Sequence, residues 1–159
     1  MSQIYKTNSG GGGTNPILDA SVTLTSQQIK GLAETFIQVV PPPASGKVIY
    51  IVSGWYKLVY GGTSAFTNTT DLDMVYDYDG MNEYFAGTSI DGTTLSDTQN
   101  EYLPIMNGRL SSTSSIAFDG IEGKGVQIIN PGGAGNDITG NPENNNSLVI
   151  HVKYYIDTL

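Results

Sequence analysis

Cysteine is absent from the 159 residues, and basic residues are scarce. Without cysteine, neither a disulfide framework nor a thiolate metal site is available. Seven Lys and Arg oppose fifteen Asp and Glu, which gives a net charge of −8, and the basic residues form no cluster. Such a chain repels phosphate backbones and anionic lipid surfaces, so we expect neither a nucleic-acid nor a membrane partner.

Charged residues and histidine are also few. Charged residues make up 14% of the chain, against roughly 25% in an average globular domain, so Ser, Thr, Asn and Gly must supply most of the polar surface. A single histidine, His151, leaves too few ligands for zinc. No nucleophile motif accompanies it, so a Ser-His-Asp triad is not indicated. We predict a protein that is not an enzyme and needs no cofactor.

The rest of the chain is rich in short alternating segments separated by turn residues, which is typical of strands. A helix of two turns at most is expected over 26–34, capped by Thr25 or Ser26 and weakened by Gly31. An irregular stretch is expected at 101–106 and a long polar loop at 131–147. The segments expected as strands are 20–25, 35–40, 46–62 with a bulge or bend at Gly54, 71–79, 82–87, 114–120, 124–130 and 147–157.

About eight strands without helix–strand alternation predict an all-β fold. We expect an antiparallel two-sheet β-sandwich of jelly-roll type over 17–159, with one short helical turn. An immunoglobulin-like sandwich is the alternative. Residues 1–16 are expected to form an extended, flexible arm, because the four glycines Gly10 to Gly13 lose much backbone entropy on ordering.

Four aspartates form the sharpest local pattern. Asp71, Asp73, Asp77 and Asp79 alternate with apolar residues, so they share one face of the expected strand. Two interpretations are open. The carboxylates are either weak calcium candidates, helped by loop oxygens, or a solvated face that keeps an edge strand from unwanted pairing. The second interpretation is favoured, because the EF-hand spacing is absent.

His151 is expected on the polar face of the last strand, opposite the apolar residues, where a lone histidine is usually solvated or interfacial. Ten tyrosines and one tryptophan are suited to the core and to subunit interfaces, and exposed aromatic rings also stack on sugars. Phe66 in the 61–70 loop is the candidate for a glycan contact. A polysaccharide-cleaving site would need Asp77 and Asp79 with Glu83 or Glu101.

Two stretches resemble recurrent patterns of tailed-bacteriophage structural proteins. The leader SQIYKTNSGGGG is similar to leaders in which a short SQIYK-type peptide precedes a glycine- or serine-rich tether. The segment 22–66 resembles a second phage pattern, in which an "LTxxQI" turn leads to a "GKVI" strand entry and a long strand ending in "YGG". Together they cover about 60 residues near the N-terminus.

The resemblance implies a virion structural protein, and we expect a capsid decoration or cement protein on the capsid surface. Its arm would dock on the major capsid protein or another virion protein through Ile4, Tyr5 and Lys6. Because one arm alone binds weakly, a homotrimer that presents three arms is expected. The alternative is a receptor-binding tip of a tail or fibre that recognises a host glycan, with loops 61–70 and 131–147 as its contacts. A functionless N-terminal tail is also consistent with these residues.

Overall fold

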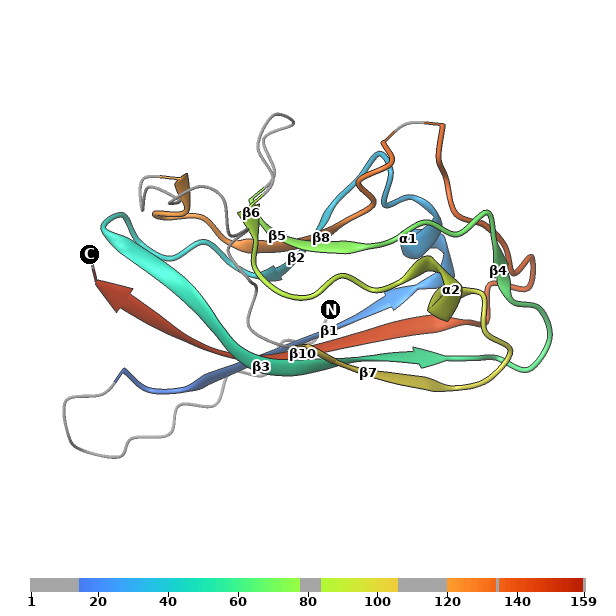
Figure 1. Ribbon diagram of the computed structural model, residues 1–159, viewed down its shortest axis with the longest axis horizontal. Helices are drawn as coiled ribbons and strands as arrows, with labels where there is room; N and C mark the ends of the chain where they lie inside the picture. Colours follow the sequence, from blue (N-terminus) through green and yellow to red (C-terminus); the bar gives the residue numbers. More distant parts are fainter. Residues whose placement is uncertain (1–14, 78–83, 106–119, 134, 159) are drawn as a thin grey trace.

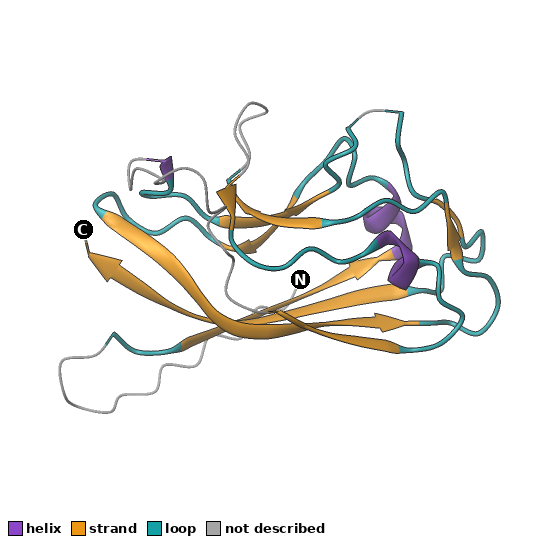
Figure 2. Cartoon of the chain, in the orientation of Figure 1, coloured by secondary structure: helices purple, strands orange, loops and turns teal. Residues whose placement is uncertain are grey.

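The computed structural model describes residues 15–77, 84–105, 120–133 and 135–158 (Figure 1). This described part of the chain is mostly β, with antiparallel sheets and two short helices, as Figure 2 shows by colour. The elements are β1 (Leu18–Thr25), α1 (Ser26–Lys30), β2 (Ile37–Val40), β3 (Lys47–Val59), β4 (Phe66–Thr67), β5 (Asp73–Tyr76), β6 (Tyr84–Phe85), α2 (Gly92–Leu95), β7 (Glu101–Ile105), β8 (Val126–Ile129), β9 (Thr139–Gly140) and β10 (Ser147–Thr158).

The strands form two four-stranded sheets and one small ladder. One sheet has the order β1-β10-β3-β7, and the other has the order β2-β8-β5-β6. Strands β4 and β9 pair separately, and every pairing is antiparallel. The two larger sheets lie in separate layers, with α1 and α2 toward the same end of the molecule as β4 (Figure 1). Neither helix of the described residues is long or apolar enough to cross a membrane.

One apolar core contains side chains from both large sheets. It is built by the alternation of the strands, which places every second side chain on the inner face. In β10, for example, the even-numbered residues Leu148, Ile150 and Val152 are almost fully buried, as the sequence pattern predicts. The buried residues contributed by the opposite sheet include Val39, Met74, Val126 and Ile128.

Strand β3 changes its inward-facing residues half-way along its length. Ile49 and Ile51 are buried in its first half, and Tyr56 and Leu58 in its second half. The switch occurs at a bulge, because Ser53 pairs with Lys153 and Ile51 with Tyr154, so that β3 has one extra residue, Val52, between these two pairs. The sequence predicted this irregularity at Gly54, and the structure places it two residues earlier. A bulge of this kind bends the strand and re-aims the side chains that follow it.

Gly54 has a different role in the same sheet. It pairs with Val152 on β10 and with Ile105 on β7, so it lies in the middle of the sheet. A Cβ atom at this position would collide with the backbone carbonyl oxygen of His151 and lie 3.1 Å from the Cα of Val152. The close approach of the two backbones therefore requires glycine.

The first helix follows the sequence prediction, and the second does not. Thr25 caps α1, since its hydroxyl accepts from the backbone N–H of Gln28 and the Gln28 side chain accepts from the Thr25 N–H. Gly31 ends this helix after five residues. The expectation of a single helical turn is wrong, because Asp91 caps a further short helix, α2. Its first residue is Gly92, a poor helix former, which hid it in the sequence.

Strand β7 corrects another expectation, since 101–106 was predicted to be irregular. Residues Glu101–Ile105 pair with β3 along one side only. Pro104 is tolerated there because an edge strand has one side on which no N–H is needed. The strand expected at 114–120 lies outside the described residues except for its last position.

Side-chain hydrogen bonds fix much of the 131–147 segment, which the sequence predicts as a long polar loop. It contains β9 and a buried asparagine, Asn141, with a backbone φ of +40°. The Asn141 amide accepts from the Ser26 hydroxyl at 2.6 Å and from the Asn146 N–H at 3.1 Å. It donates to the carbonyl of Ser64 at 2.9 Å and to the Asn145 side chain at 2.8 Å. This asparagine network joins the 61–70 loop, the start of α1 and the start of β10.

Candidate functional site on the outer face of a sheet

The outer face of the sheet β1-β10-β3-β7 carries a row of side chains that point away from the core. Because register places residues side by side across strands, His151 on β10 lies next to Trp55 on β3, and Trp55 lies next to Pro104 on β7. In the neighbouring row, Lys57 lies next to Tyr102. Three strands therefore contribute to this surface.

Three rings on this face are in contact, and we call His151, Trp55 and Tyr102 the aromatic ridge. The rings of Trp55 and His151 are stacked, with centroids 5.3 Å apart and planes 20° apart. Those of Trp55 and Tyr102 are tilted by 44°, with centroids 5.2 Å apart. The ammonium of Lys57 lies 5.7 Å from the centre of the Tyr102 ring. Tyr102 is 61% exposed, so the ridge reaches solvent at the β7 edge.

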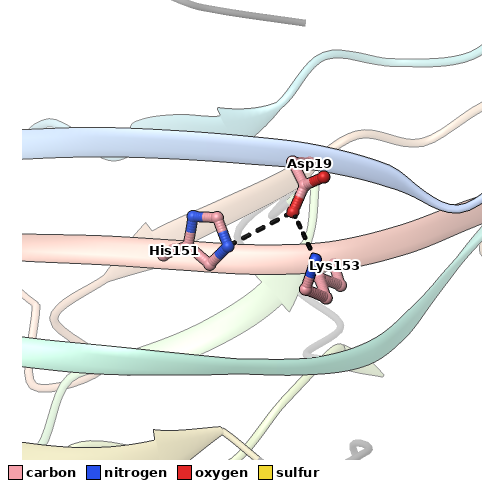
Figure 3. Close-up of polar contacts among 3 residues, drawn as sticks. All are labelled: Asp19, His151 and Lys153. Atoms are coloured by element: carbon pink, nitrogen blue, oxygen red, sulfur yellow. Dashed lines mark hydrogen bonds and ion pairs between the residues drawn. The ribbon is translucent and has the colours of Figure 1, made fainter. Parts of the chain in front are cut away.

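Charged side chains lie at the other end of the ridge, beside His151. One carboxylate oxygen of Asp19, on β1, lies 3.3 Å from the Nε2 of His151 and 2.9 Å from the Nζ of Lys153 (Figure 3). All three side chains are partly exposed, so each pair contributes at most about 1 kcal/mol to stability. The face predicted for His151 is confirmed by the alternating burial of β10.

A second aromatic pair extends the same face along β3 and β10. The rings of Tyr50 and Tyr155 are stacked, with centroids 5.0 Å apart and planes 19° apart. Burial raises the pKa of Tyr50, and the nearby Tyr155 and Asp157 raise it further. Between this pair and the ridge lies the bulged Val52, which is 38% exposed. Tyr50 also packs against the core and is only partly exposed, so this pair offers less open surface than Tyr102 does.

The sequence contains part of the signal for this surface. Alternation places Trp55 and Lys57 on one face of their strand and His151 and Lys153 on one face of theirs. The contact of Trp55 with His151 depends on the pairing of β3 with β10, which alternation alone does not fix. Tyr102 was missed because its segment was expected to be irregular.

The stacking of the only tryptophan on the only histidine gives a spectroscopic prediction. The imidazole of His151 covers part of the indole, so removing it exposes more of Trp55 to water. We expect the emission of Trp55 to shift to longer wavelength in the variant His151→Gln. Steady-state fluorescence of the folded wild type and variant measures this. An emission maximum that is the same in both proteins would contradict the stacking.

Phe66 is not available for a glycan contact. Its side chain is fully buried, because β4 pairs with β9 and turns the ring into the core. The expectation that it is an exposed stacking residue is therefore wrong. A strand signal of two residues is too short for the sequence to reveal.

The aspartates do not form the solvated face of an edge strand. Strand β5 lies between β8 and β6, and Asp73 is buried on it. Asp71 accepts from the Gly92 N–H at 2.9 Å, and Asp77 accepts from the Gly125 N–H at 2.8 Å. Asp79 lies outside the described residues. Among the residues that the structure describes, no three His, Asp or Glu side chains are grouped to hold a metal ion.

Buried Asp73 predicts a pH dependence of stability. Burial raises the pKa of its carboxyl, a hydrogen bond with Ser89 lowers it, and Asp71 raises it further. A raised pKa in the folded state gives stability that is present below the unfolded value and is lost as the pH rises through the folded value. The variant Asp73→Asn should therefore gain stability relative to the wild type between about pH 4 and about pH 7. Thermal unfolding at both pH values measures this, and an equal difference at both would contradict it.

The remaining predicted site residues are only partly described. Ile4, Tyr5, Lys6 and Glu83 lie outside the described residues, as Asp79 does. In the proposed polysaccharide-cleaving group, Asp77 is bound to Gly125 and, at 3.2 Å, to the Gln38 side chain.

A groove of about 550 Å³ is a second exposed feature, on the α1 and β2 side of the molecule. Phe36 lines it and is 48% exposed. The other lining residues are Thr25, Gln27, Gln28, Gly31, Thr35, Ile37 and Gln38. These side chains are mostly neutral and polar, so the groove carries less aromatic surface than the aromatic ridge.

Two lysines and one carboxylate, Lys57, Lys153 and Asp19, flank the aromatic ridge, so this surface can bind a partner both by ring contact and by charge. Comparisons with protein-family models, curated proteins and solved structures give no match. On geometry, the ridge is the strongest candidate site among the described residues.

Proposed function

We propose that the two large sheets form a jelly-roll sandwich. The observation that supports this is the nesting of their strand pairs. The innermost pair is β5 with β6, followed outward by β3 with β7, β2 with β8, and β1 with β10. Successive pairs alternate between the two sheets. Eight strands folded back on themselves in this way make the two Greek keys of a jelly roll.

We further propose that the protein is a non-enzymatic structural protein of a phage virion, which decorates or cements the capsid. Jelly rolls are a recurrent architecture of viral capsid domains. The nested pairing carries the proposal, and the resemblance of residues 2–13 and 22–66 to phage structural proteins supports it. In this function the sandwich is a rigid body that assembles with other virion subunits.

The N-terminal arm is the proposed attachment to the major capsid protein or another virion protein. The described chain begins at Asn15, whose amide donates to the Asp157 side chain at 2.9 Å. This bond joins the base of the arm to the end of β10. Ile4, Tyr5 and Lys6 would bind the neighbouring protein, and a homotrimer would raise the effective concentration of the arms.

Light scattering behind size exclusion tests the assembly. We expect a mass of about 51 kDa, three times 16.9 kDa, that does not change with concentration. Deletion of residues 1–14 leaves the Asn15–Asp157 bond in place, so it should keep the trimer but abolish binding to capsid shells. A full-length chain that stays monomeric would overturn the assembly proposal. An arm-less trimer that still decorates shells would overturn the role of the arm.

A receptor-binding tip that recognises a host glycan is the second candidate. The exposed ring of Tyr102 favours this function, because it can stack on a sugar, whereas Phe66 is buried and cannot. Saturable binding on a glycan array, lost in Tyr102→Ser, would support this function over capsid decoration.

A further inference from the structure

We propose that the aromatic ridge and its flanking lysines are the surface through which copies of this chain contact one another. The inference rests on the proposed assembly and names its interface. Four independent features of the sheet β1-β10-β3-β7 carry it: the orientation of the rings, the continuity of the apolar face, its charge, and the form of its edge.

Ring orientation favours a protein partner over a sugar. Strand β3 lies between β10 and β7, so Trp55 has His151 on one side and Tyr102 on the other. Neighbouring rings therefore occupy both sides of the indole, and little of either face is available to stack on a sugar. A row of packed rings is a rigid, amphipathic projection, and Tyr and Trp of this kind dominate the energetics of protein interfaces.

The apolar surface continues beyond the three rings. Val52 is 38% exposed, and the stacked Tyr50–Tyr155 pair follows it along β3. An extended aromatic face on a folded chain marks an interaction surface rather than scattered exposure. Its course along the two longest described strands suits contact with another flat, folded subunit.

Charge is suited to a second copy as the partner. The charged side chains around the extended face are Lys57, Lys153, Asp19 and, beside the tyrosine pair, Asp157, which sum to zero. The whole chain carries −8. The face is therefore a locally neutral region of an acidic chain, where two like-charged copies repel each other least, and this repulsion weakens with salt.

The form of the edge strand β7 indicates that copies meet through the outer face of the sheet. On the edge strand β7, Pro104 has no N–H to donate, so the strand is a poor template for pairing with a second chain. Tyr102 on the same strand projects from the outer face instead. Copies would therefore meet across side chains and would not join into a continuous sheet.

Variants matched in exposure test the interface. Tyr102→Ser removes the most exposed ring of the ridge, and Phe36→Ser removes an exposed ring in the groove, so the second is the control. Lys57→Glu reverses the charge at a partly exposed position that is not part of the core. We expect Tyr102→Ser and Lys57→Glu to weaken self-association at least about tenfold, a typical effect of a hot-spot residue. Phe36→Ser should retain the wild-type mass.

The readouts are the mass by light scattering over a wide concentration range and the Trp55 emission, which should shift to shorter wavelength on assembly. Circular dichroism verifies that each variant is folded. The Lys57→Glu defect should deepen at low salt, where like charges repel most. A trimer that both variants leave intact would overturn this inference alone. A monomeric wild-type chain would overturn the proposed assembly as well, and glycan binding by that monomer would favour the receptor-binding function.

Discussion

Replacing Asn141 with alanine is expected to lower the free energy of unfolding by about 3–4 kcal/mol. The substitution removes four hydrogen bonds at once and leaves the buried N–H of Asn146 unsatisfied, while Ser26 and Ser64 each keep one bond to Asn146. Ser26 and Asn146 are both buried. Alanine also adopts the left-handed φ of this position less readily than asparagine does.

Urea unfolding of the wild type and the variant measures this loss. Asn144→Ala is the matched control, because Asn144 also has a positive φ, +53°, and bonds to Lys30 at 2.7 Å, but is exposed. We expect that variant to lose only about 1 kcal/mol. Equal losses in the two variants would show that backbone conformation, and not the buried network, sets the stability of this loop.

The second large effect is expected at Gly54. Alanine at this position places a methyl group against the carbonyl oxygen of His151. This contact lies in the middle of the sheet, where β3 and β10 are paired. The strands must then separate, which breaks ladder hydrogen bonds and disturbs the neighbouring Trp55. We expect a loss of at least about 3 kcal/mol, comparable with the overpacking of a core, or a failure to fold.

Gly31→Ala is the control for Gly54→Ala. A Cβ atom at Gly31 would meet its nearest neighbour, the Gln27 carbonyl oxygen, at an ordinary 3.5 Å. Its effect should stay within about 0.5 kcal/mol. Thermal unfolding of both variants measures the loss, and Trp55 emission reports on the ridge. The comparison distinguishes the effect of the close backbone contact at Gly54 from the effect of replacing any glycine. A Gly54→Ala protein as stable as the wild type would contradict the close approach.

Sequence reasoning succeeded where the signal is local. The alternation in 147–157 predicted β10 and the outward face of His151, and the Thr25 cap predicted α1. Both depend only on side chains a few residues apart. The antiparallel sheets followed from many short strands without helical connections.

It failed where a distant segment determines the outcome. Asp73 was expected in solvent because it alternates with apolar residues, but β6 and β8 flank its strand and bury it. The bulge at Val52 depends on how β10 pairs with β3, so the nearby glycine was a misleading marker. The Asp19–His151 contact joins the two ends of the described chain, and nothing in either local segment indicates it.

The nested order of the strands also governs how the molecule folds. The outermost pair joins Leu18 to Tyr154, so nearly the whole chain must be closed into a loop before β1 is in place, and topologies of this kind fold slowly. This outermost pairing brings Asp19 to His151 and also fixes the base of the N-terminal arm. A subunit whose β1 is not yet in place thus has neither the carboxylate beside the ridge nor an anchored arm. Assembly through these two features would take up only fully folded subunits.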